Sequence, residues 1–190
     1  MTDCIRTSPL GPTLETRRLI LRPPVREDFD SLCAFHADEA TVKYLGGVQS
    51  PAAVWRIMCV MAGAWHLDGL SMFSVLDKTT GDWMGRIGPL YPHGWPGCEV
   101  GWGLHSKFWG KGYAVEAAVA AMDYVTDVLG WEDIIHSIAP DNPGSAALAA
   151  KLGSTNRGPG RLPDPYADQA VDIWGQTAAQ WRENRVRFLK

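Results

Sequence analysis

A glycine-rich turn between a strand and a helix constrains this chain more than any other feature. Residues 107–114 read Lys-Phe-Trp-Gly-Lys-Gly-Tyr-Ala. They follow a strand-like run at 98–104 and open an alanine-rich segment, 113–129, that favours a helix. Such a turn leaves several backbone N–H groups without partners at the positive end of the helix dipole. The pattern therefore predicts an anion site, and a phosphorylated ligand fits it.

The spacing of this turn differs from two familiar phosphate-binding loops. A P-loop needs four residues between its first glycine and a Gly-Lys-Ser/Thr triplet, which the turn lacks. A dinucleotide-binding loop needs a third glycine or alanine at position 115, where this chain has valine. A helix entry whose glycines serve tight packing and bind no ligand stays open as an alternative.

The order basic-x-x-Gly-x-Gly resembles the coenzyme A loop of the GCN5-related N-acetyltransferase (GNAT) family, where Gln or Arg usually occupies the position of Lys107. The amino-acid sequence from Phe108 onward is similar to that of the family branch that acetylates ribosomal-protein N-termini. A second segment, 142–153, resembles the family pattern Asn-x-x-Ser/Ala followed by Leu-Gly-Phe, with Ser154 in place of the phenylalanine. Two such segments in the family order are far more specific than either one alone.

Periodicity predicts mixed strands and helices in a single domain, 1–190. We expect strands at 14–21, 71–76, 83–90, 99–105, 134–138 and in a closing pair that includes 171–174. We expect helices at 26–36, 51–67, 113–129, 143–152 and near 177–185. The order strand, helix, strand makes 99–105 and 134–138 a parallel pair. The resemblance implies an α/β fold of the α+β type: a mixed, mostly antiparallel sheet of six or seven strands, helices on both faces, and that parallel pair flanking the coenzyme site.

Composition narrows the partners and the compartment. The net charge is −3 and no basic run is present, so nucleic acid is not an expected partner. Without a membrane-length apolar stretch or a signal-peptide core at the N-terminus, a cytoplasmic monomer or homodimer is expected, with no membrane partner. The scattered cysteines favour reduced thiols over a disulfide framework or a metal site, and a buried structural role for the cysteine near the loop. They are Cys4, Cys33, Cys59 and Cys98.

The resemblance implies acetyl-CoA as co-substrate, with no metal. In the family the backbone at the positions of Trp102 and Leu104 faces the pantetheine, and the side chain at Asn142 hydrogen-bonds the same arm. The loop would hold the pyrophosphate through its N–H groups, and a Cβ at either glycine would push the backbone away from the phosphates. The expected loop residues are Lys107, Phe108, Trp109, Gly110, Lys111, Gly112, Tyr113 and Ala114. For Lys111, a phosphate contact and a solvated loop lysine are both open.

Two residues carry the predicted acid–base chemistry. Glu99 is the best carboxylate on the strand before the loop to remove a proton from the amine, directly or through water, and a structural carboxylate is the alternative. The tyrosine that many members place seven residues after the asparagine is replaced by Ala149. The N-terminal-acetylating branch uses a serine three residues after the asparagine, so the resemblance makes Ser145 the predicted donor of a proton to the leaving thiolate. The alternative is an ordinary N-cap that involves both residues. The resemblance also implies that the oxyanion of the tetrahedral intermediate accepts a hydrogen bond from a backbone N–H near Gly101 or Trp102.

The acceptor amine is the least constrained prediction. Branch resemblance favours a protein or peptide N-terminal α-amine, and a small-molecule amine such as an amino acid, polyamine or antibiotic is the alternative. A non-catalytic acyl-CoA sensor and a structural domain that binds no ligand also stay open. Four tryptophans are candidates to line an aromatic acceptor pocket, although each on its own is more typical of a core residue. They are Trp55, Trp65, Trp95 and Trp174.

Overall fold

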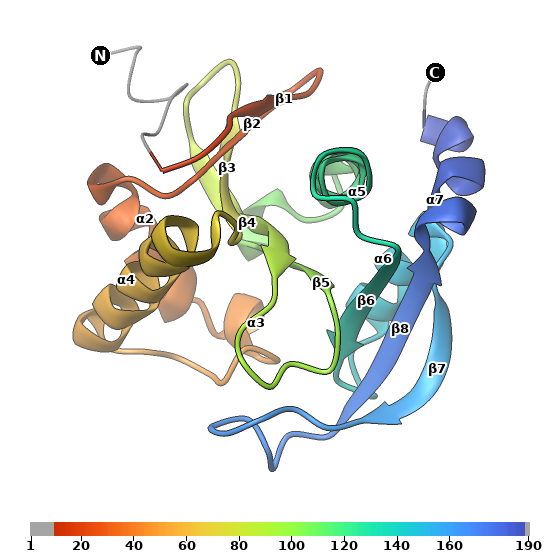
Figure 1. The fold of residues 1–190 in the computed structure, drawn as a ribbon. Helices are drawn as coiled ribbons and strands as arrows, with labels where there is room; N and C mark the ends of the chain where they lie inside the picture. The colour runs from red at the N-terminus through yellow and green to blue at the C-terminus, as the bar shows by residue number, and fades with distance from the viewer. Residues whose placement is uncertain (1–9, 189–190) are drawn as a thin grey trace. The chain divides into compact units, whose positions relative to one another are not determined.

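The computed structural model describes residues 10–188, which divide into two compact units. Of these residues, the first unit holds 10–88 together with Trp102–Ala120, and the second holds Pro89–Gly101 and 121–188. The strands hydrogen-bond in the order β1-β2-β3-β4-β5-β6-β8-β7 (Figure 1). β5 and β6 pair in parallel, whereas the pairs β1–β2, β2–β3, β3–β4, β6–β8 and β7–β8 are antiparallel. The predicted α/β class and the parallel pair are confirmed.

The sheet has eight strands rather than six or seven, because the segment predicted as one strand forms two. β1 (Leu14–Glu15) turns back onto β2 (Leu19–Arg22) as an antiparallel pair. The side chain of Thr16 makes this turn, since its hydroxyl accepts from the N–H of Leu19 at 2.9 Å. Periodicity alone could not reveal it, because a threonine hydroxyl that bonds the nearby backbone competes with an extended strand.

The other strands of the first unit were predicted closely. β3 (Phe73–Asp77) and β4 (Trp83–Leu90) form the expected antiparallel hairpin, and β2 pairs with β3. β5 (Glu99–Leu104) follows, and its second half belongs to this unit.

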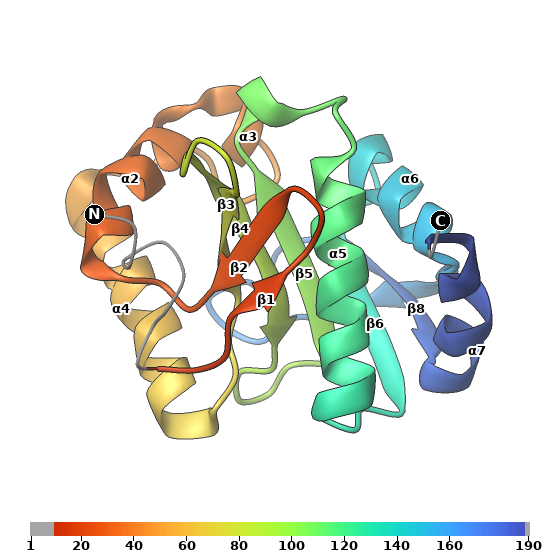
Figure 2. The same ribbon diagram turned by 90° about the horizontal axis from the view of Figure 1, so that it is seen from above.

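Helices beside these strands enclose the core of the first unit (Figure 2). The short turn η1 (Arg26–Asp28) leads into α2 (Phe29–Ala37), and α3 (Glu39–Val42), which periodicity did not predict, follows it. α4 (Pro51–Asp68) has Ser50 as its N-cap and Pro51 in its first turn. The side chains that pack together between these helices and the strands are apolar and buried, and each stabilises the fold by roughly 1.5–3 kcal/mol. They are Ile20, Leu32, Phe35, Val42, Val54, Met58, Leu76 and Trp83.

The second unit is built on an antiparallel β6–β8–β7 section. β6 (Asp133–Ile138) pairs with β8 (Val171–Thr177), which pairs in turn with β7 (Thr155–Gly160). α6 (Pro143–Leu152) ends at Gly153 in the left-handed conformation, as predicted.

Two further helices, each followed by a short helical turn, complete the described chain. α5 (Tyr113–Asp123) begins in the first unit and continues into the second as a π-helical turn, η3 (Tyr124–Val128). α7 (Ala178–Asn184) and the turn η4 (Arg185–Phe188) close the chain near the predicted 177–185 helix. Trp181 of α7 is fully buried, and its indole N–H donates to the carboxylate of Asp123 at 2.9 Å.

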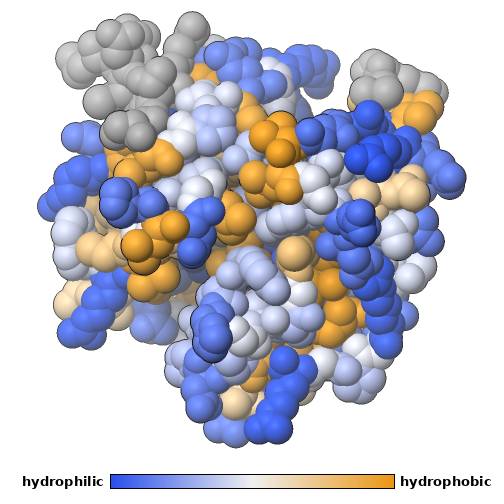
Figure 3. Space-filling view, in the orientation of Figure 1, coloured by the Kyte–Doolittle hydropathy of each residue, from blue (hydrophilic) through white to orange (hydrophobic). Residues whose placement is uncertain are grey.

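On the face drawn in Figure 3, hydrophilic side chains predominate and apolar ones form small separate groups. Within residues 10–188, no helix is long and apolar enough to cross a membrane. Three cysteines are free thiols, Cys33, Cys59 and Cys98, while Cys4 lies outside the described residues.

Candidate active site

The turn between β5 and α5 has the predicted glycine geometry. β5 ends at Leu104, a short turn η2 (Ser106–Phe108) follows, and α5 begins at Tyr113. Gly110 has φ +72° and Gly112 has φ +78°, both in the left-handed region that side chains with a Cβ disfavour. A Cβ on Gly110 would meet nothing within 4 Å. The backbone conformation alone therefore requires glycine at these positions, whatever binds.

The N–H groups in the second half of this turn are free to bind a ligand, whereas those of Lys107, Phe108 and Trp109 donate to His105 or Ser106 and are not available as predicted. Glu116 N–H makes the first bond of the helix, to the carbonyl of Gly112 at 3.2 Å. Over the part of the chain that the structure describes, the preceding amides, 110–114, have no protein acceptor. Amides that precede the first helical bond, together with the helix dipole, are the donors that bind a pyrophosphate.

An arginine that sequence reasoning missed holds the turn from one side. Arg18 Nη1 donates to the carbonyl of Lys111 at 3.0 Å, and its guanidinium carbon lies 4.3 Å from the ring centroid of Tyr113. Arg18 Nε also donates to Glu116 Oε2 at 2.6 Å. These contacts tie the β1–β2 turn to the first turn of α5. No local motif marks Arg18, because its partners lie nearly one hundred residues away.

The carboxylate of Glu116 keeps its charge in this arrangement. Burial acts to raise its pKa, but hydrogen bonds from Thr16 and Arg18 outweigh burial and lower the pKa below its usual value. The hydroxyl of Thr16 donates to Oε1 at 2.6 Å and the backbone N–H of Arg18 to the same oxygen at 2.7 Å. Glu116 therefore remains an anion at neutral pH and fixes the guanidinium beside the loop.

Two lysines add positive charge at the turn. Lys111 Nζ donates to the carbonyl of Lys107 at 3.2 Å, and Lys107 Nζ lies 4.8 Å from the ring centroid of Phe108. Both lysines are exposed, and no carboxylate of the described residues pairs with either. Their ammonium groups are available to an anion at the turn.

Trp109 forms a hydrogen bond with the Leu104 carbonyl, a backbone group that the family resemblance assigned to pantetheine binding. Its indole N–H donates to the carbonyl of Leu104 at 2.7 Å, while about half of the side chain is exposed. That carbonyl already has one partner, so a strand-like contact of pantetheine with Leu104 would use its second lone pair or displace the indole. Sequence periodicity gives no signal for a contact of this kind.

In the second unit, Glu99 is a buried carboxylate with two donors on one oxygen. The indole N–H of Trp95 donates to Oε2 at 2.6 Å and the hydroxyl of Ser137 donates to it at 2.7 Å. Burial raises the pKa of Glu99, and these hydrogen bonds offset only part of the rise. A hydrogen bond from the backbone N–H of Ser137 to the same carboxylate also acts to lower the pKa. A carboxyl group with a raised pKa suits proton transfer near neutral pH.

Asn142 and Ser145 contact each other in the N-terminal cap of α6. Asn142 is the N-cap of α6, and its Oδ1 accepts from the N–H of Ser145 at 3.1 Å. Its Nδ2 donates to the hydroxyl oxygen of Ser145, also at 3.1 Å. The predicted N-cap is therefore present. In this contact the hydroxyl oxygen of Ser145 is the acceptor.

Cys98 next to Glu99 has the features of a structural thiol. Burial, and to a smaller extent the charge of Asp133, raise its pKa above the ordinary value. A raised pKa disfavours the thiolate, which is the nucleophilic form. Within the described residues no cluster of metal-ligating side chains is found.

The four tryptophans proposed for an acceptor pocket lie in different surroundings. Trp65 is 2% exposed and belongs to the core, whereas Trp55 is 41% exposed. Trp95 contacts Glu99 as described above, and Trp174 is half-buried on β8. Trp65 is thus not a pocket residue.

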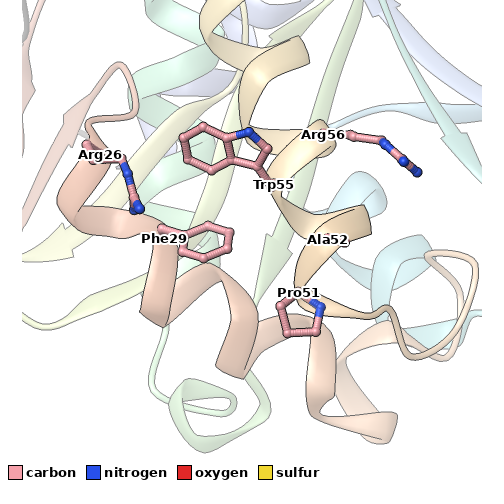
Figure 4. A pocket seen from close by; sticks show the side chains of 6 residues that line it. All are labelled: Arg26, Phe29, Pro51, Ala52, Trp55 and Arg56. Atoms are coloured by element: carbon pink, nitrogen blue, oxygen red, sulfur yellow. The ribbon is translucent and has the colours of Figure 1, made fainter.

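Trp55 lines a surface hollow of about 480 Å³ in the first unit (Figure 4). Its ring meets that of Phe29 edge-on, with centroids 5.4 Å apart, and the guanidinium of Arg26 lies 4.8 Å from the Trp55 ring centroid. In the same view the side chain of Arg56 extends away from these rings. The hollow is separate from the glycine turn in sequence, and we assign it no role.

The chain is similar to known acetyltransferases in sequence and in fold. The family model described as "Acetyltransferase (GNAT) domain" matches residues 18–155. The uncharacterized N-acetyltransferase p20 of Bacillus licheniformis is 31% identical over 165 residues, covering 85% of this chain and 93% of the relative. The crystal structure of an acetyltransferase from Agrobacterium tumefaciens strain C58 has a TM-score of 0.75 and 32% identity, covering 87% of this chain and 94% of that one.

These similarities show that the protein is an acetyltransferase, an enzyme that transfers an acyl group. The chain belongs to the GNAT acetyltransferase family, whose members use acetyl-CoA as co-substrate. A putative ribosomal-protein-serine acetyltransferase from Vibrio cholerae also shares the fold, with a TM-score of 0.75, 18% identity, and coverage of 87% of this chain and 97% of that one. That likeness shows the fold alone, so the ribosomal-protein branch stays a prediction.

Proposed function

We propose that this protein binds acetyl-CoA at the 107–114 turn and transfers the acetyl group to a primary amine, with a peptide or protein N-terminal α-amine as the favoured acceptor. The observation that carries the proposal is the turn itself. It combines two glycines in the left-handed conformation, a run of free amides and unpaired lysines, in a chain of the GNAT family. No other segment of the described residues joins these features.

The turn fits the pyrophosphate of coenzyme A on physical grounds. The free amides supply donors without desolvating a charged side chain, and the helix dipole favours negative charge at this end of α5. Lys107 and Lys111 are exposed cations that a phosphate can reach. Arg18 stiffens the turn through the Lys111 carbonyl, which reduces the entropy lost when a ligand orders it.

We assign the proton transfers to Glu99 and Ser145. The amine nitrogen attacks the thioester carbonyl, a C–N bond forms and the C–S bond breaks. Glu99 accepts the proton that the amine loses, while the hydrogen bonds from Trp95 and Ser137 hold its carboxylate in place. Ser145 donates its hydroxyl proton to the leaving thiolate and regains one from solvent. Asn142 orients this hydroxyl through the Nδ2 contact.

The oxyanion that develops on the carbonyl needs a fixed donor. We assign this role to a backbone N–H of β5 at Gly101 or Trp102, on the family resemblance. The favoured acceptor rests on the similarity of the turn and of the start of α5 to the N-terminal-acetylating branch. A sensor that binds acyl-CoA without turnover would keep the turn but show no transfer.

The test uses the full chain with acetyl-CoA and a panel of amines: peptides with free N-termini, amino acids, polyamines and aminoglycosides. Free-thiol release reports turnover, and mass spectrometry identifies the acetylated product. We expect transfer, with peptides as the best acceptors. Transfer to small amines only would overturn the acceptor assignment. Coenzyme binding without thiol release would indicate a sensor instead of an enzyme.

Gly110→Val tests the coenzyme assignment, with Gly130→Val as its matched control. Both glycines have positive φ, +72° and +69°, and neither has an atom within 4 Å of an added Cβ. The two changes impose similar backbone strain, but only the first lies in the turn. We expect Gly110→Val to lower acetyl-CoA affinity about a hundredfold, measured by calorimetry, while the control keeps it. Equal affinities would show that the coenzyme binds elsewhere.

A further inference from the structure

The parallel pairing of β5 and β6 stops early in the second unit. Ile135 N–H donates to the carbonyl of Cys98 at 2.9 Å, and the register pairs Glu99 with Ile135. No further register pair is found between the two strands over the described residues. The next carbonyl on the same side of β5 belongs to Val100, since backbone groups of alternate residues face the same neighbour. In a continuing ladder it would accept from the backbone of β6.

A side chain takes that place. His136 Nδ1 lies 2.7 Å from the carbonyl oxygen of Val100. A carbonyl can only accept, so Nδ1 carries the hydrogen and Nε2 carries the lone pair. The imidazole therefore stands where the main-chain bond of a regular pair would lie, and the strands separate from this residue onward.

The tautomer of His136 is fixed by a buried chain of hydrogen bonds. Nε2 accepts from the hydroxyl of Ser154 at 3.0 Å, and that oxygen accepts from Gln176 Nε2 at 3.1 Å. Gln176 Oε1 accepts from Asn184 Nδ2 at 3.0 Å. His136, Ser154 and Gln176 are each at most 4% exposed. Every donor in this chain meets an acceptor, so the ring cannot flip without leaving buried groups unpaired.

The hydrogen bonds of Ser154 explain why this chain departs from the family pattern at position 154. The family segment ends in Leu-Gly-Phe, and this chain has serine where the phenylalanine stands. A phenylalanine offers no donor to His136 Nε2 and no acceptor to Gln176 Nε2. Serine at 154 and histidine at 136 therefore form one unit, in which a polar bridge replaces an aromatic ring.

We propose that His136 is a positioning residue for acetyl transfer: it fixes where the β5–β6 pair opens and how the β5 backbone is oriented there. This inference rests on the proposed function. The bond to Val100 orients the peptide group that leads into Gly101, the start of the stretch to which we assigned the oxyanion donor. A donor misplaced by an ångström loses much of its effect on the transition state.

The first measurement needs only the wild-type protein. Long-range ¹H–¹⁵N correlation spectra distinguish the two tautomers of a neutral imidazole. We expect His136 to be the Nδ1–H tautomer at pH 7. Finding the Nε2–H tautomer would overturn the proposal, because the ring could not then donate to Val100.

The second measurement compares two variants of His136 with a control. His136→Leu removes the donor to Val100, and His136→Asn offers an amide N–H near the position of Nδ1. His36→Leu is the control, because His36 is also 1% exposed and its ring nitrogens have no partner in the described residues. We expect His136→Leu to lower kcat about tenfold or more, His136→Asn to lower it less, and the control to stay within about twofold. Coenzyme A affinity should change little, since the turn is untouched.

The outcomes separate the two proposals. A fully active His136→Leu protein would overturn the positioning role even if acetyl transfer is confirmed. The positioning role would also be overturned if the leucine and asparagine variants lost kcat equally and only in proportion to the loss of folded protein. That result would mean that His136 has a purely structural role. If His136→Leu does not fold, Ser154→Ala provides the same comparison, because it frees the ring to turn. A wild-type protein without thiol release on any amine would overturn the proposed function, while the tautomer would still report the hydrogen bond.

Discussion

Arg18 and Glu116 form an ion pair across 98 residues of chain, with Arg18 Nε 2.6 Å from Glu116 Oε2. The pair joins the β1–β2 turn to the first turn of α5, and the same guanidinium donates to the carbonyl of Lys111. It therefore links the start of the sheet to the turn that we propose for coenzyme binding. The local stability of that turn depends on a residue far outside it.

We expect Arg18→Ala to raise the KM for acetyl-CoA about threefold to tenfold and to destabilise the protein by about 1–2 kcal/mol, because it leaves the Glu116 carboxylate with fewer partners. Arg157→Ala is the control. Arg157 also pairs with a carboxylate, Asp133 at 2.7 Å, but on an exposed part of the second unit. Acetyl-CoA titrations and urea unfolding measure both effects. Equal KM values in the two variants would contradict a role for Arg18 at the turn.

The buried imidazole of His136 predicts a fall in stability in mild acid. Burial lowers its pKa from 6.5 to about 4, and its bond to Val100 only partly opposes this. Between these values the unfolded chain binds the proton and the folded protein does not, so the free energy of unfolding rises with pH. The stabilisation is complete above pH 6.5 and is lost as the pH falls toward 4. For this one group the loss between pH 7 and pH 5 is about 2 kcal/mol.

Urea unfolding at pH 7 and pH 5 measures that loss, and His136→Leu isolates it. The variant should lose less stability between the two pH values than the wild type, although it is less stable at pH 7. His36 also has a pKa lowered to about 4, by burial and then by the charge of Arg86, so part of the wild-type dependence will remain. An unchanged pH dependence in His136→Leu would show that the ring already titrates normally in the folded protein.

Glu99 predicts an acid limb in the pH–rate profile. Only the carboxylate can accept a proton from the amine, and burial raises its pKa, so kcat/KM should fall with decreasing pH at a higher pH than for an exposed glutamate. Glu99→Gln should remove this limb and lower kcat about a hundredfold. If Glu99→Gln kept the wild-type kcat and the same acid limb, Glu99 would be a structural carboxylate and not the base.

Trp95→Phe gives a finer test of the same group. The indole N–H stabilises the charged form of Glu99, so its removal should raise the pKa and move the acid limb to higher pH. Trp174→Phe is the matched control, because this half-buried tryptophan of the second unit is not among the hydrogen-bond donors to Glu99 in the described residues. A limb that stays in place in Trp95→Phe would mean that the indole does not bond the carboxylate in solution.

Much of the fold followed from the sequence because local signals determine it. Pro51 after Ser50 marks the start of α4, and Gly153 marks the end of α6, as the structure confirms. The first strand was predicted wrongly because a single hydroxyl, that of Thr16, turns the chain back.

The candidate site was predictable where it is local and unpredictable where it depends on distant contacts. The turn at 107–114 and the Asn142 cap are contiguous motifs, so the sequence located them. The partners of Glu99, Trp109 and His136 are set by tertiary packing and leave no periodic trace. Ser154 looked like a weakened motif, yet in the structure it completes a hydrogen-bond chain.

Ser145→Ala separates catalysis from helix capping. The cap uses the backbone N–H of Ser145 and the side chain of Asn142, so the alanine variant keeps that bond and should change stability by less than about 1 kcal/mol. If the hydroxyl protonates the thiolate, kcat should nonetheless fall about tenfold to a hundredfold. Asn142→Ala removes the cap itself and should cost about 1 kcal/mol of stability. A kcat for Ser145→Ala that matches the wild type across the pH range would leave the serine as a capping residue and assign the proton to water.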